Sequence, residues 1–143
     1  MGKQVQPGEM NAVTDYSALI DGAGINVCKL LLDDELTILW ANDNFYISSG
    51  FGKDEYQTLF HHIKAYYTGH GDEFAKIKNA FYDVLQKGER RVKVGCRRPL
   101  KDNTCTWINI DGIITGEIVD SKPVALAVYS DISDLTRLKA ERD

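Results

Sequence analysis

Residues 104–134 read TCTWINIDGIITGEIVDSKPVALAVYSDISD. Residues 104–115 and 123–129 are two apolar runs rich in β-branched side chains, and they predict two strands of a sheet. The second run passes without a break through SDIS, at 130–133, into the charged segment 134–142. A strand that continues into an exposed helix can transmit a change in the sheet to another domain. This stretch therefore predicts a sensing module and not a self-sufficient enzyme.

The composition is that of one ordinary globular domain. The chain has 143 residues, of which 43% are hydrophobic and 27% are charged, so a packed core is expected and disorder is not. A formal net charge of −4, without a basic stripe, argues against nucleic acid as a partner. Cys28, Cys96 and Cys105 form no Cys-x-x-Cys pair, which indicates reduced thiols in a cytoplasmic protein. No apolar run is long enough for a membrane span, and the N-terminus lacks the apolar core of a signal peptide.

The order of the remaining elements predicts an α+β fold. Residues 26–32 and 37–41 form a predicted hairpin, short helices are expected after Asn42 and from Lys53, and a longer amphipathic helix is expected at 72–88. Further strands are predicted at 90–98, 104–115 and 123–130. The order of two strands, three helices and three strands predicts a five-stranded antiparallel sheet with helices on one face.

Segments on both sides of this unit predict flanking helices. Residues 1–24 comprise a mobile lead-in and an amphipathic helix at 11–21, which either packs on its own domain or forms a dimer contact. Residues 25–131 are the predicted domain. Residues 132–143 are expected to form a connector helix to an output domain beyond this sequence, the alternative being a terminal helix packed on its own sheet.

Short motifs occur in an order that resembles the PAS family of sensory domains. WANDNF at 40–45, followed by GFGKDE at 50–55, is similar to the second strand of that family and the helix break after it. KDN at 101–103, followed by TWI at 106–108, is similar to the penultimate hairpin of the family. DIS at 131–133 is similar to its terminal Asp-Ile-Thr. The resemblance covers nearly the whole chain and implies the same α+β fold.

The resemblance also implies a small-molecule pocket between the sheet and its helices, with mostly apolar walls and few polar groups. Strand alternation places five candidate residues on the inner face of two strands: Val94, Cys96, Arg98, Ile108 and Ile110. The resemblance adds Ala127 and Tyr129 from the last strand. The alternative is a filled core at the same positions, with no ligand.

Arg98 gives the sharpest prediction, because an unpaired buried guanidinium is costly. Its partner is either an anionic ligand, which would make the domain a sensor of small carboxylates, or Asp131, in a structural ion pair at the end of the sheet. We favour the ion pair with Asp131. We also expect Asp131, Ile132 and Ser133 to relay a change in the sheet to the helix that follows.

Other chemistry has less support in the sequence. The stretch 61–71 is longer than the usual connection in the family and contains His61, His62 and His70, so haem ligation by one histidine is the alternative to an ordinary polar role. No metal-ligand spacing and no Gly-rich phosphate loop occurs, and we expect neither a metal site nor a catalytic site. No Asn-Cys-Arg-Phe-Leu motif of the flavin-binding branch is present, so covalent flavin photochemistry is not expected, and the cofactor is unknown.

Together these features predict a cytoplasmic sensory and regulatory module and not an enzyme. It would bind a small ligand or a partner, form a homodimer and relay its state to a linked output domain of histidine kinase or diguanylate cyclase type. One alternative is a ligand-free domain for protein–protein interaction and dimerisation. Another is a haem- or metal-binding sensor or a small enzyme.

Overall fold

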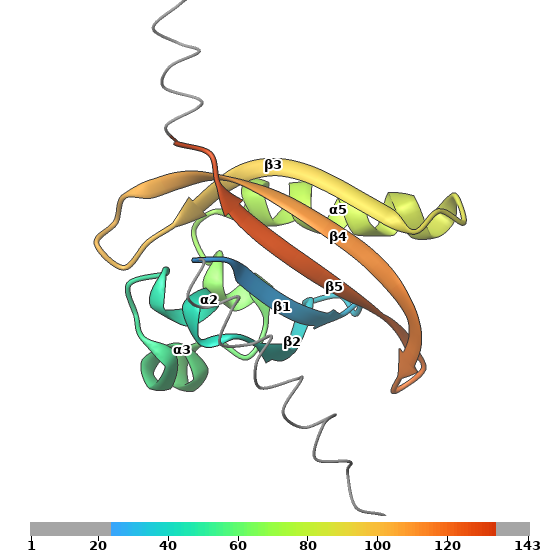
Figure 1. Cartoon of the computed structure of the whole chain (residues 1–143), viewed down its shortest axis with the longest axis horizontal. Helices are drawn as coiled ribbons and strands as arrows, with labels where there is room; N and C mark the ends of the chain where they lie inside the picture. The colour runs from blue at the N-terminus through green and yellow to red at the C-terminus, as the bar shows by residue number, and fades with distance from the viewer. Residues whose placement is uncertain (1–23, 134–143) are drawn as a thin grey trace, which may run out of the picture.

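The computed structural model describes residues 24–133 (Figure 1). This part of the chain contains five strands: β1 (Asn26–Leu31), β2 (Thr37–Ala41), β3 (Arg91–Pro99), β4 (Cys105–Val119) and β5 (Lys122–Asp131). Four helices connect β2 to β3: α2 (Asp43–Ile47), α3 (Lys53–Leu59), α4 (Ile63–Tyr66) and α5 (Gly71–Gln86). The helix predicted at 11–21 lies outside the described residues, as does the predicted connector except for Ile132 and Ser133.

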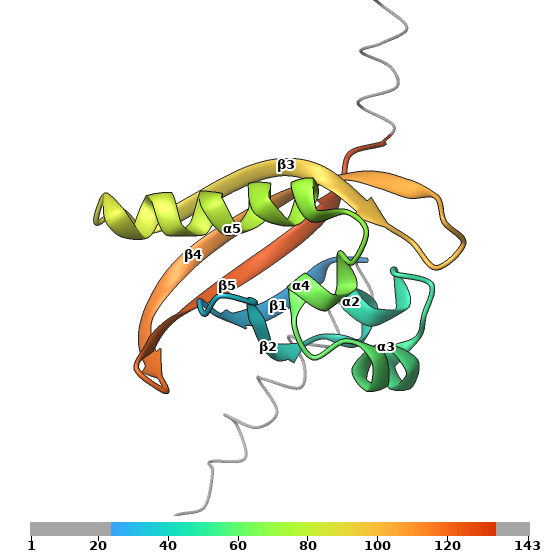
Figure 2. The same cartoon turned by 180° about the vertical axis from the view of Figure 1, so that it is seen from behind.

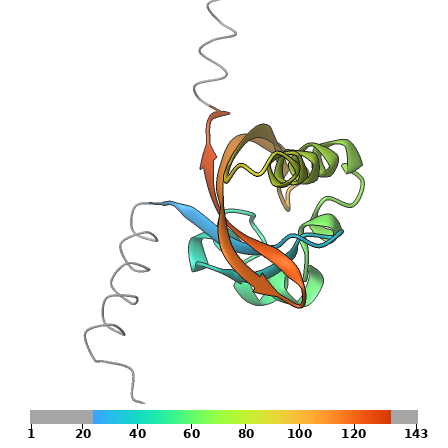
Figure 3. The same cartoon turned by 90° about the vertical axis from the view of Figure 1, so that its right-hand side faces the viewer.

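The strands form one antiparallel sheet in the order β2-β1-β5-β4-β3. The last strand in the chain, β5, therefore lies at the centre, between β1 and β4. Helix α5 lies along β3 and β4, while α2, α3 and α4 gather near the other end of the same face (Figure 2). In the side view α5 lies on one side of a strongly twisted sheet (Figure 3). The predicted α+β fold, with a five-stranded antiparallel sheet and helices on one face, is confirmed.

Asn42 connects the start of β1 to the start of α2. Its side-chain oxygen accepts hydrogen bonds from the backbone N–H of Val27, at 2.9 Å, and of Phe45, at 3.3 Å. Its side-chain amide donates to the carbonyl of Ile25, at 2.8 Å. Asn42 therefore caps α2, as its residue type predicts, and fixes this helix beside β1.

The helical region contains one helix more than the predicted order. The additional helix, α4, lies in the stretch 61–71 and begins after His62, whose imidazole Nδ1 accepts the backbone N–H of Ala65 at 3.1 Å. Histidine is not among the residue types that usually cap helices, so the sequence carries no clear signal for this start. The carbonyl of His61 accepts the N–H of Ile38 at 3.1 Å, which docks the segment onto the outer edge of β2.

The amphipathic helix predicted at 72–88 corresponds to α5, and it buries the predicted apolar stripe of Phe74, Ile77 and Phe81. Its contact with β4 depends on Gly112, because a Cβ atom at that position would lie 2.9 Å from the ring of Phe81. Any larger residue at 112 would displace the ring of Phe81 from its position against β4. In the stretch 24–133, no helix has the length and apolar character that crossing a membrane requires.

Candidate functional site

The interior between the sheet and the helices contains the seven residues that were predicted to bind a ligand. Strand pairing places Cys96 opposite Ile108 and Ile110 opposite both Val94 and Tyr129. Six of the seven are buried, and Val94 is partly buried at the margin of the same cluster: Val94, Cys96, Arg98, Ile108, Ile110, Ala127 and Tyr129. The inward register on β3, β4 and β5 is therefore as predicted, while a binding role for these residues stays a prediction.

Arg98 is the charged residue of this interior, and its side chain is held by neutral groups. The residue is 2% exposed. Its Nη1 donates to Ser48 Oγ at 2.7 Å, and its Nη2 donates to the carbonyl of Phe45 at 2.8 Å. The guanidinium carbon lies 4.9 Å from the ring centre of Phe45, 5.4 Å from that of Tyr129 and 5.6 Å from that of Tyr66. Aromatic faces attract a cation, so the three rings compensate part of the desolvation cost.

The predicted ion pair between Arg98 and Asp131 is wrong. Asp131 is exposed, and its Oδ1 accepts the backbone N–H of Ser133 at 2.8 Å. In the sheet, Arg98 pairs with Thr106 while Asp131 pairs with Ile108, and the two side chains do not meet. None of the ion pairs formed among residues 24–133 includes Arg98. The positive charge of Arg98 is therefore buried without a carboxylate from the described chain.

Two tyrosine hydroxyls in the same interior have no nitrogen or oxygen partner among the described residues, and each lies beside a buried thiol, Cys96 in one case and Cys28 in the other. They belong to Tyr67 and Tyr129, which are 2% exposed each. Burial raises the pKa of both phenols well above their usual value, so both hydroxyls remain protonated and can donate. The guanidinium of Arg98 donates to two neutral acceptors and lacks an anionic one, while the two tyrosine hydroxyls are donors without an oxygen acceptor.

A cluster of aromatic rings fills the space between these polar groups and the helices. Phe45 contacts the rings of Tyr46, Tyr56 and Tyr129 edge to face, at centre distances between 5.2 and 5.7 Å. The cluster continues through Tyr56 to Tyr66, at 5.2 Å. The hydroxyl of Tyr66 donates to the carbonyl of Pro99 at the end of β3. This packing accounts for the burial of Arg98 and makes the interior dense.

The buried thiols do not have the properties of nucleophiles. Burial raises the pKa of Cys28 to about 12, and it raises the pKa of Cys96 to about 11. Both side chains are fully buried and remain uncharged at neutral pH. They act as small apolar residues of the core, while Cys105 is exposed at the start of β4.

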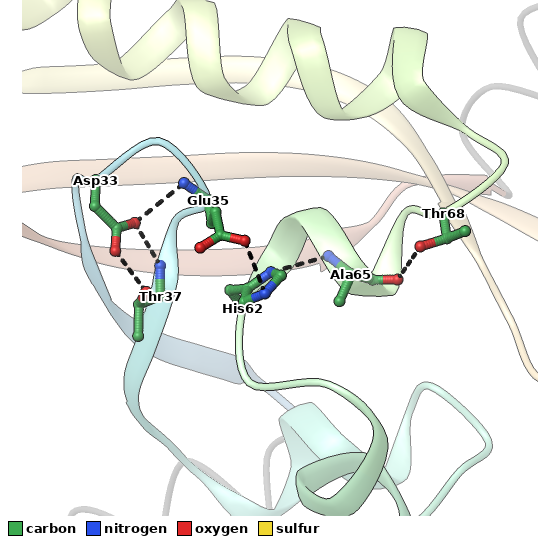
Figure 4. Close-up of polar contacts among 6 residues, drawn as sticks. All are labelled: Asp33, Glu35, Thr37, His62, Ala65 and Thr68. Carbon is green, nitrogen blue, oxygen red and sulfur yellow. Dashed lines mark hydrogen bonds and ion pairs between the residues drawn. The ribbon is translucent and has the colours of Figure 1, made fainter.

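His62 belongs to a polar network at the surface and not to the interior (Figure 4). His62 Nε2 lies 3.1 Å from Glu35 Oε2, and its Nδ1 accepts from Ala65, so both ring nitrogens are engaged. Asp33 closes the turn between β1 and β2 by accepting the N–H of Thr37 at 3.0 Å. His61 and His70 are exposed. Within residues 24–133, no three His, Cys, Asp or Glu side chains are placed to hold a metal ion.

The predicted relay residues lie against Trp107 of β4. The backbone N–H of Ile132 donates to the carbonyl of Trp107 at 2.8 Å. The N–H of Trp107 donates to Ser133 Oγ at 3.0 Å. The chain therefore leaves β5 while it is still bound to the neighbouring strand β4. A relay role for these residues stays a prediction.

A surface cavity is lined by one of the residues that hold the buried arginine. It has a volume of about 510 Å³, and its lining includes Ser48, Gly50 and Lys101. Ser48 is also the residue whose hydroxyl accepts from Arg98. Ser48 therefore contacts both the cavity and the guanidinium, which makes this cavity a candidate approach to Arg98 from solvent.

Sequence reasoning missed the groups that surround Arg98: Phe45, Ser48, Tyr66 and Tyr67. A signal for them existed in the density of aromatic residues, because residues 45–67 contain three Phe and four Tyr. Since an inward arginine needs partners, the most aromatic segment of the chain was a candidate to supply them. The carbonyl of Phe45 could not have been identified, because every residue has one.

No family model matches the chain. No curated protein matches it either.

Solved structures do match its fold. A sensory box histidine kinase/response regulator from Burkholderia thailandensis aligns with a TM-score of 0.64 and 17% identity, covering 89% of this chain and 94% of the other. The PAS domain of an HTR-like protein from Haloarcula marismortui aligns with a TM-score of 0.59 and 17% identity, covering 86% and 93%. A LOV protein from Rhodobacter sphaeroides aligns with a TM-score of 0.60 and 18% identity, covering 86% and 68%. At these identities the similarity concerns the fold.

Proposed function

This chain has the PAS fold, and we propose that it acts as a sensory module that binds a small anionic ligand and relays its binding to an output domain. The observation that carries the proposal is Arg98, a buried cation with no carboxylate partner in the described chain. An anion with several acceptor oxygens would satisfy the guanidinium together with the hydroxyls of Tyr67 and Tyr129. A small carboxylate has this chemistry.

Binding at this position requires some rearrangement of the aromatic cluster. Ser48 and the carbonyl of Phe45 now accept the two Arg98 hydrogen bonds, and a carboxylate would replace one or both of them. Because charge-assisted hydrogen bonds are stronger than neutral ones, this exchange favours the anion. Lys101, at the cavity beside Ser48, adds a positive charge near the approach, although it also pairs with Glu55 at 2.8 Å.

The relay would pass through β5. Tyr129 contacts Arg98 and belongs to the strand that ends at Asp131, so a ligand at Arg98 would act on the strand that leads to Ile132 and Ser133. The ligand can shift the exit segment only to the extent that it binds one arrangement more tightly than the other. The matched Burkholderia protein is named as a histidine kinase/response regulator, which supports an output of this kind, and a diguanylate cyclase or a homodimeric assembly is a further part of the proposal.

The test is a titration of the 143-residue chain with acetate, pyruvate, succinate and benzoate, each compared with its uncharged amide. We expect at least one carboxylate to raise the melting temperature, and its amide to have no effect. Arg98→Met should abolish the response, while Tyr82→Phe, which removes a hydroxyl bonded to the carbonyl of Leu32 far from Arg98, should retain it. No stabilisation by any carboxylate, or equal stabilisation by the amides, contradicts the proposal.

A ligand-free interaction domain is the second candidate, and the filled aromatic interior favours it. Native mass spectrometry of freshly purified protein separates the two candidates. A mass equal to that of the chain, together with a dimer in light scattering and no response to carboxylates, would support the interaction domain. An additional mass that disappears in Arg98→Met would support the sensor.

A flavin–thiol adduct is not part of this proposal. LOV proteins are among the structures with a similar fold, but the three cysteines of this chain lie on β1, β3 and β4. Two of them are buried thiols with a raised pKa. None is on the helices between β2 and β3.

A further inference from the structure

The start of helix α5 and the exit segment at 131–133 contact the same pair of residues from two sides. The pair is Arg97 on β3 and Trp107 on β4, which lie opposite each other in the strand register. Glu73, in the first turn of α5, contacts Arg97. Ile132 and Ser133 contact Trp107.

Glu73 holds both the main chain and the side chain of Arg97. It is 6% exposed, and its Oε2 accepts the backbone N–H of Arg97 at 2.8 Å. Its Oε1 lies 3.5 Å from Arg97 Nε and 3.3 Å from Lys76 Nζ. The N–H of Arg97 is one of those that face the open edge of β3, where Glu73 accepts it. Glu73 therefore satisfies an edge group that a neighbouring strand would otherwise take.

Arg97 connects this contact to Trp107. The guanidinium carbon of Arg97 lies 5.6 Å from the ring centre of Trp107, within the range of a cation–π contact. Glu73 fixes the orientation of the guanidinium through Nε, so a change in the position of α5 alters the contact with the indole ring.

Trp107 in turn holds the last described residues of the chain. Its carbonyl accepts the N–H of Ile132, at 2.8 Å, and its N–H donates to the hydroxyl of Ser133, at 3.0 Å. The second bond uses a side-chain hydroxyl in the place of a strand carbonyl. It can open without breaking any pair of β5 with β4, which ends at Asp131 opposite Ile108.

We propose that Glu73, Arg97 and Trp107 are positioning residues that couple the first turn of α5 to the attachment of Ser133 on β4. The two arrangements are an attached one, in which Ser133 accepts from Trp107, and a released one, in which it does not. This proposal rests on the proposed function only in treating 131–133 as the relay. The physical basis is the hydrogen bond between Trp107 and Ser133, which is made or broken, and α5 shifts the balance between these two arrangements.

The test is amide hydrogen exchange measured by NMR on the 143-residue chain. Glu73→Gln keeps the size of the side chain but removes its charge. We expect the amides of Trp107 and Ile132 to exchange at least about twentyfold faster in this variant, because local opening adds to the loss of global stability. The amides of Leu30 and Ala125, at the centre of the sheet, should accelerate less, by about the factor that corresponds to the loss of global stability in urea unfolding.

A matched control removes the other partner of the same carboxylate. Lys76→Gln eliminates the 3.3 Å contact with Glu73 and leaves both contacts with Arg97, so exchange at Trp107 should not change. Unchanged exchange at Trp107 and Ile132 in Glu73→Gln would overturn the proposal. Equal acceleration at Leu30 and Ala125 would overturn it as well, because the effect would then be a general loss of stability.

Coupling between two sites must act in both directions. Ser133→Ala removes the acceptor of the Trp107 N–H, and we expect the N–H of Arg97, which is bonded to Glu73, to exchange faster in this variant. Wild-type exchange at Arg97 would contradict the coupling. Neither exchange measurement requires a ligand. A failed carboxylate titration would therefore contradict the proposed sensor function, while the coupling would still be tested by hydrogen exchange.

Discussion

Arg97 and Arg98 are neighbours on β3, and the sheet gives them opposite surroundings. Arg97 points to the outer side, where it lies over the ring of Trp107, and it meets the carboxylate of Glu73 at the edge of β3; its side chain is 54% exposed. Arg98 points inward and is 2% exposed among three aromatic rings, a hydroxyl and a carbonyl. Arg97 has a carboxylate partner and is exposed to water, whereas Arg98 is buried and has no carboxylate partner in the described chain.

The difference indicates two kinds of role. A cation paired with a carboxylate at the surface contributes little to stability but has a defined orientation, which suits a mechanical connection. A buried cation that lacks a carboxylate has unused capacity for an anion, which suits recognition. Period-two alternation thus places a connecting residue and a recognition residue side by side in the sequence.

The largest expected effect is on the inner arginine. Arg98→Ala leaves a cavity among the aromatic rings and leaves the carbonyl of Phe45 without its donor, so the free energy of unfolding should fall by about 3 kcal/mol. Arg98→Met fills most of the space without a charge and should cost only about 1 kcal/mol. Urea unfolding followed by circular dichroism measures both values. Equal losses in the two variants would show that packing plays no part at this position.

A smaller effect is expected at the carboxylate that pairs with the outer arginine. Burial alone would raise the pKa of Glu73, but the hydrogen bond from Arg97 N–H and the charges of Lys76 and Arg97 outweigh it, and the pKa is lowered from its usual 4.5. A lowered folded-state pKa stabilises the fold above the unfolded pKa, and this contribution disappears as pH falls through the folded value. Glu73→Gln should therefore cost about 1 kcal/mol at neutral pH, discounted for the exposure of Arg97.

The pH dependence provides the check on Glu73. Unfolding free energies of the unmodified chain and of Glu73→Gln should converge as the pH falls from 4.5 through the lower folded-state pKa, below which the carboxyl group is neutral in both states. Urea titrations at several pH values measure the difference. A constant difference across this range would show that the charge of Glu73 is not what stabilises the fold.

Arg97→Lys should have a smaller effect still. Lysine keeps the positive charge near Glu73 but lacks the planar group that lies over Trp107, so a loss of about 0.5 kcal/mol is expected. The chain has two tryptophans, and Trp40→Phe leaves Trp107 as the single fluorescent probe. In that background Arg97→Lys should change the emission of Trp107. An unchanged spectrum would mean that the guanidinium does not contact the ring in solution.

The smallest effect on stability is expected at the exposed thiol. Cys105→Ser should change the free energy of unfolding by less than about 0.5 kcal/mol, because the side chain lies on the surface. The same variant should lose all rapid reaction with a disulfide reagent, since burial holds the pKa of Cys28 at about 12 and that of Cys96 at about 11. Rapid labelling of the native variant would show that the inner face of the sheet opens to solvent.

The sequence predicted the sheet, its inner residues and the cap at Asn42, because these follow from local periodicity and residue type. It could not predict the partners of Arg98. Ser48 and Phe45 are about fifty residues away in the chain and contribute a hydroxyl and a main-chain carbonyl, neither of which has a distinctive pattern. The choice of Asp131 rested on formal charge alone, and the structure corrects it.

The helix α4 was missed for a related reason. Its start depends on the imidazole of His62 and on the docking of His61 at the edge of β2, which are tertiary contacts. The sequence of 61–71 alternates His, Tyr and Gly without a helical period, so it gave no signal for a helix. The prediction failed where a segment takes its conformation from a neighbour and not from its own residues.

The central position of β5 has a consequence for how the protein is made. A ribosome synthesises β1 and β2 first and β3 and β4 much later, yet these two pairs share no strand contact until β5 lies between them. A nascent chain that ends before Lys122 therefore exposes two unpaired edges, one on β1 and one on β4, and both invite association with other chains. The domain can close only after its final strand has left the ribosome.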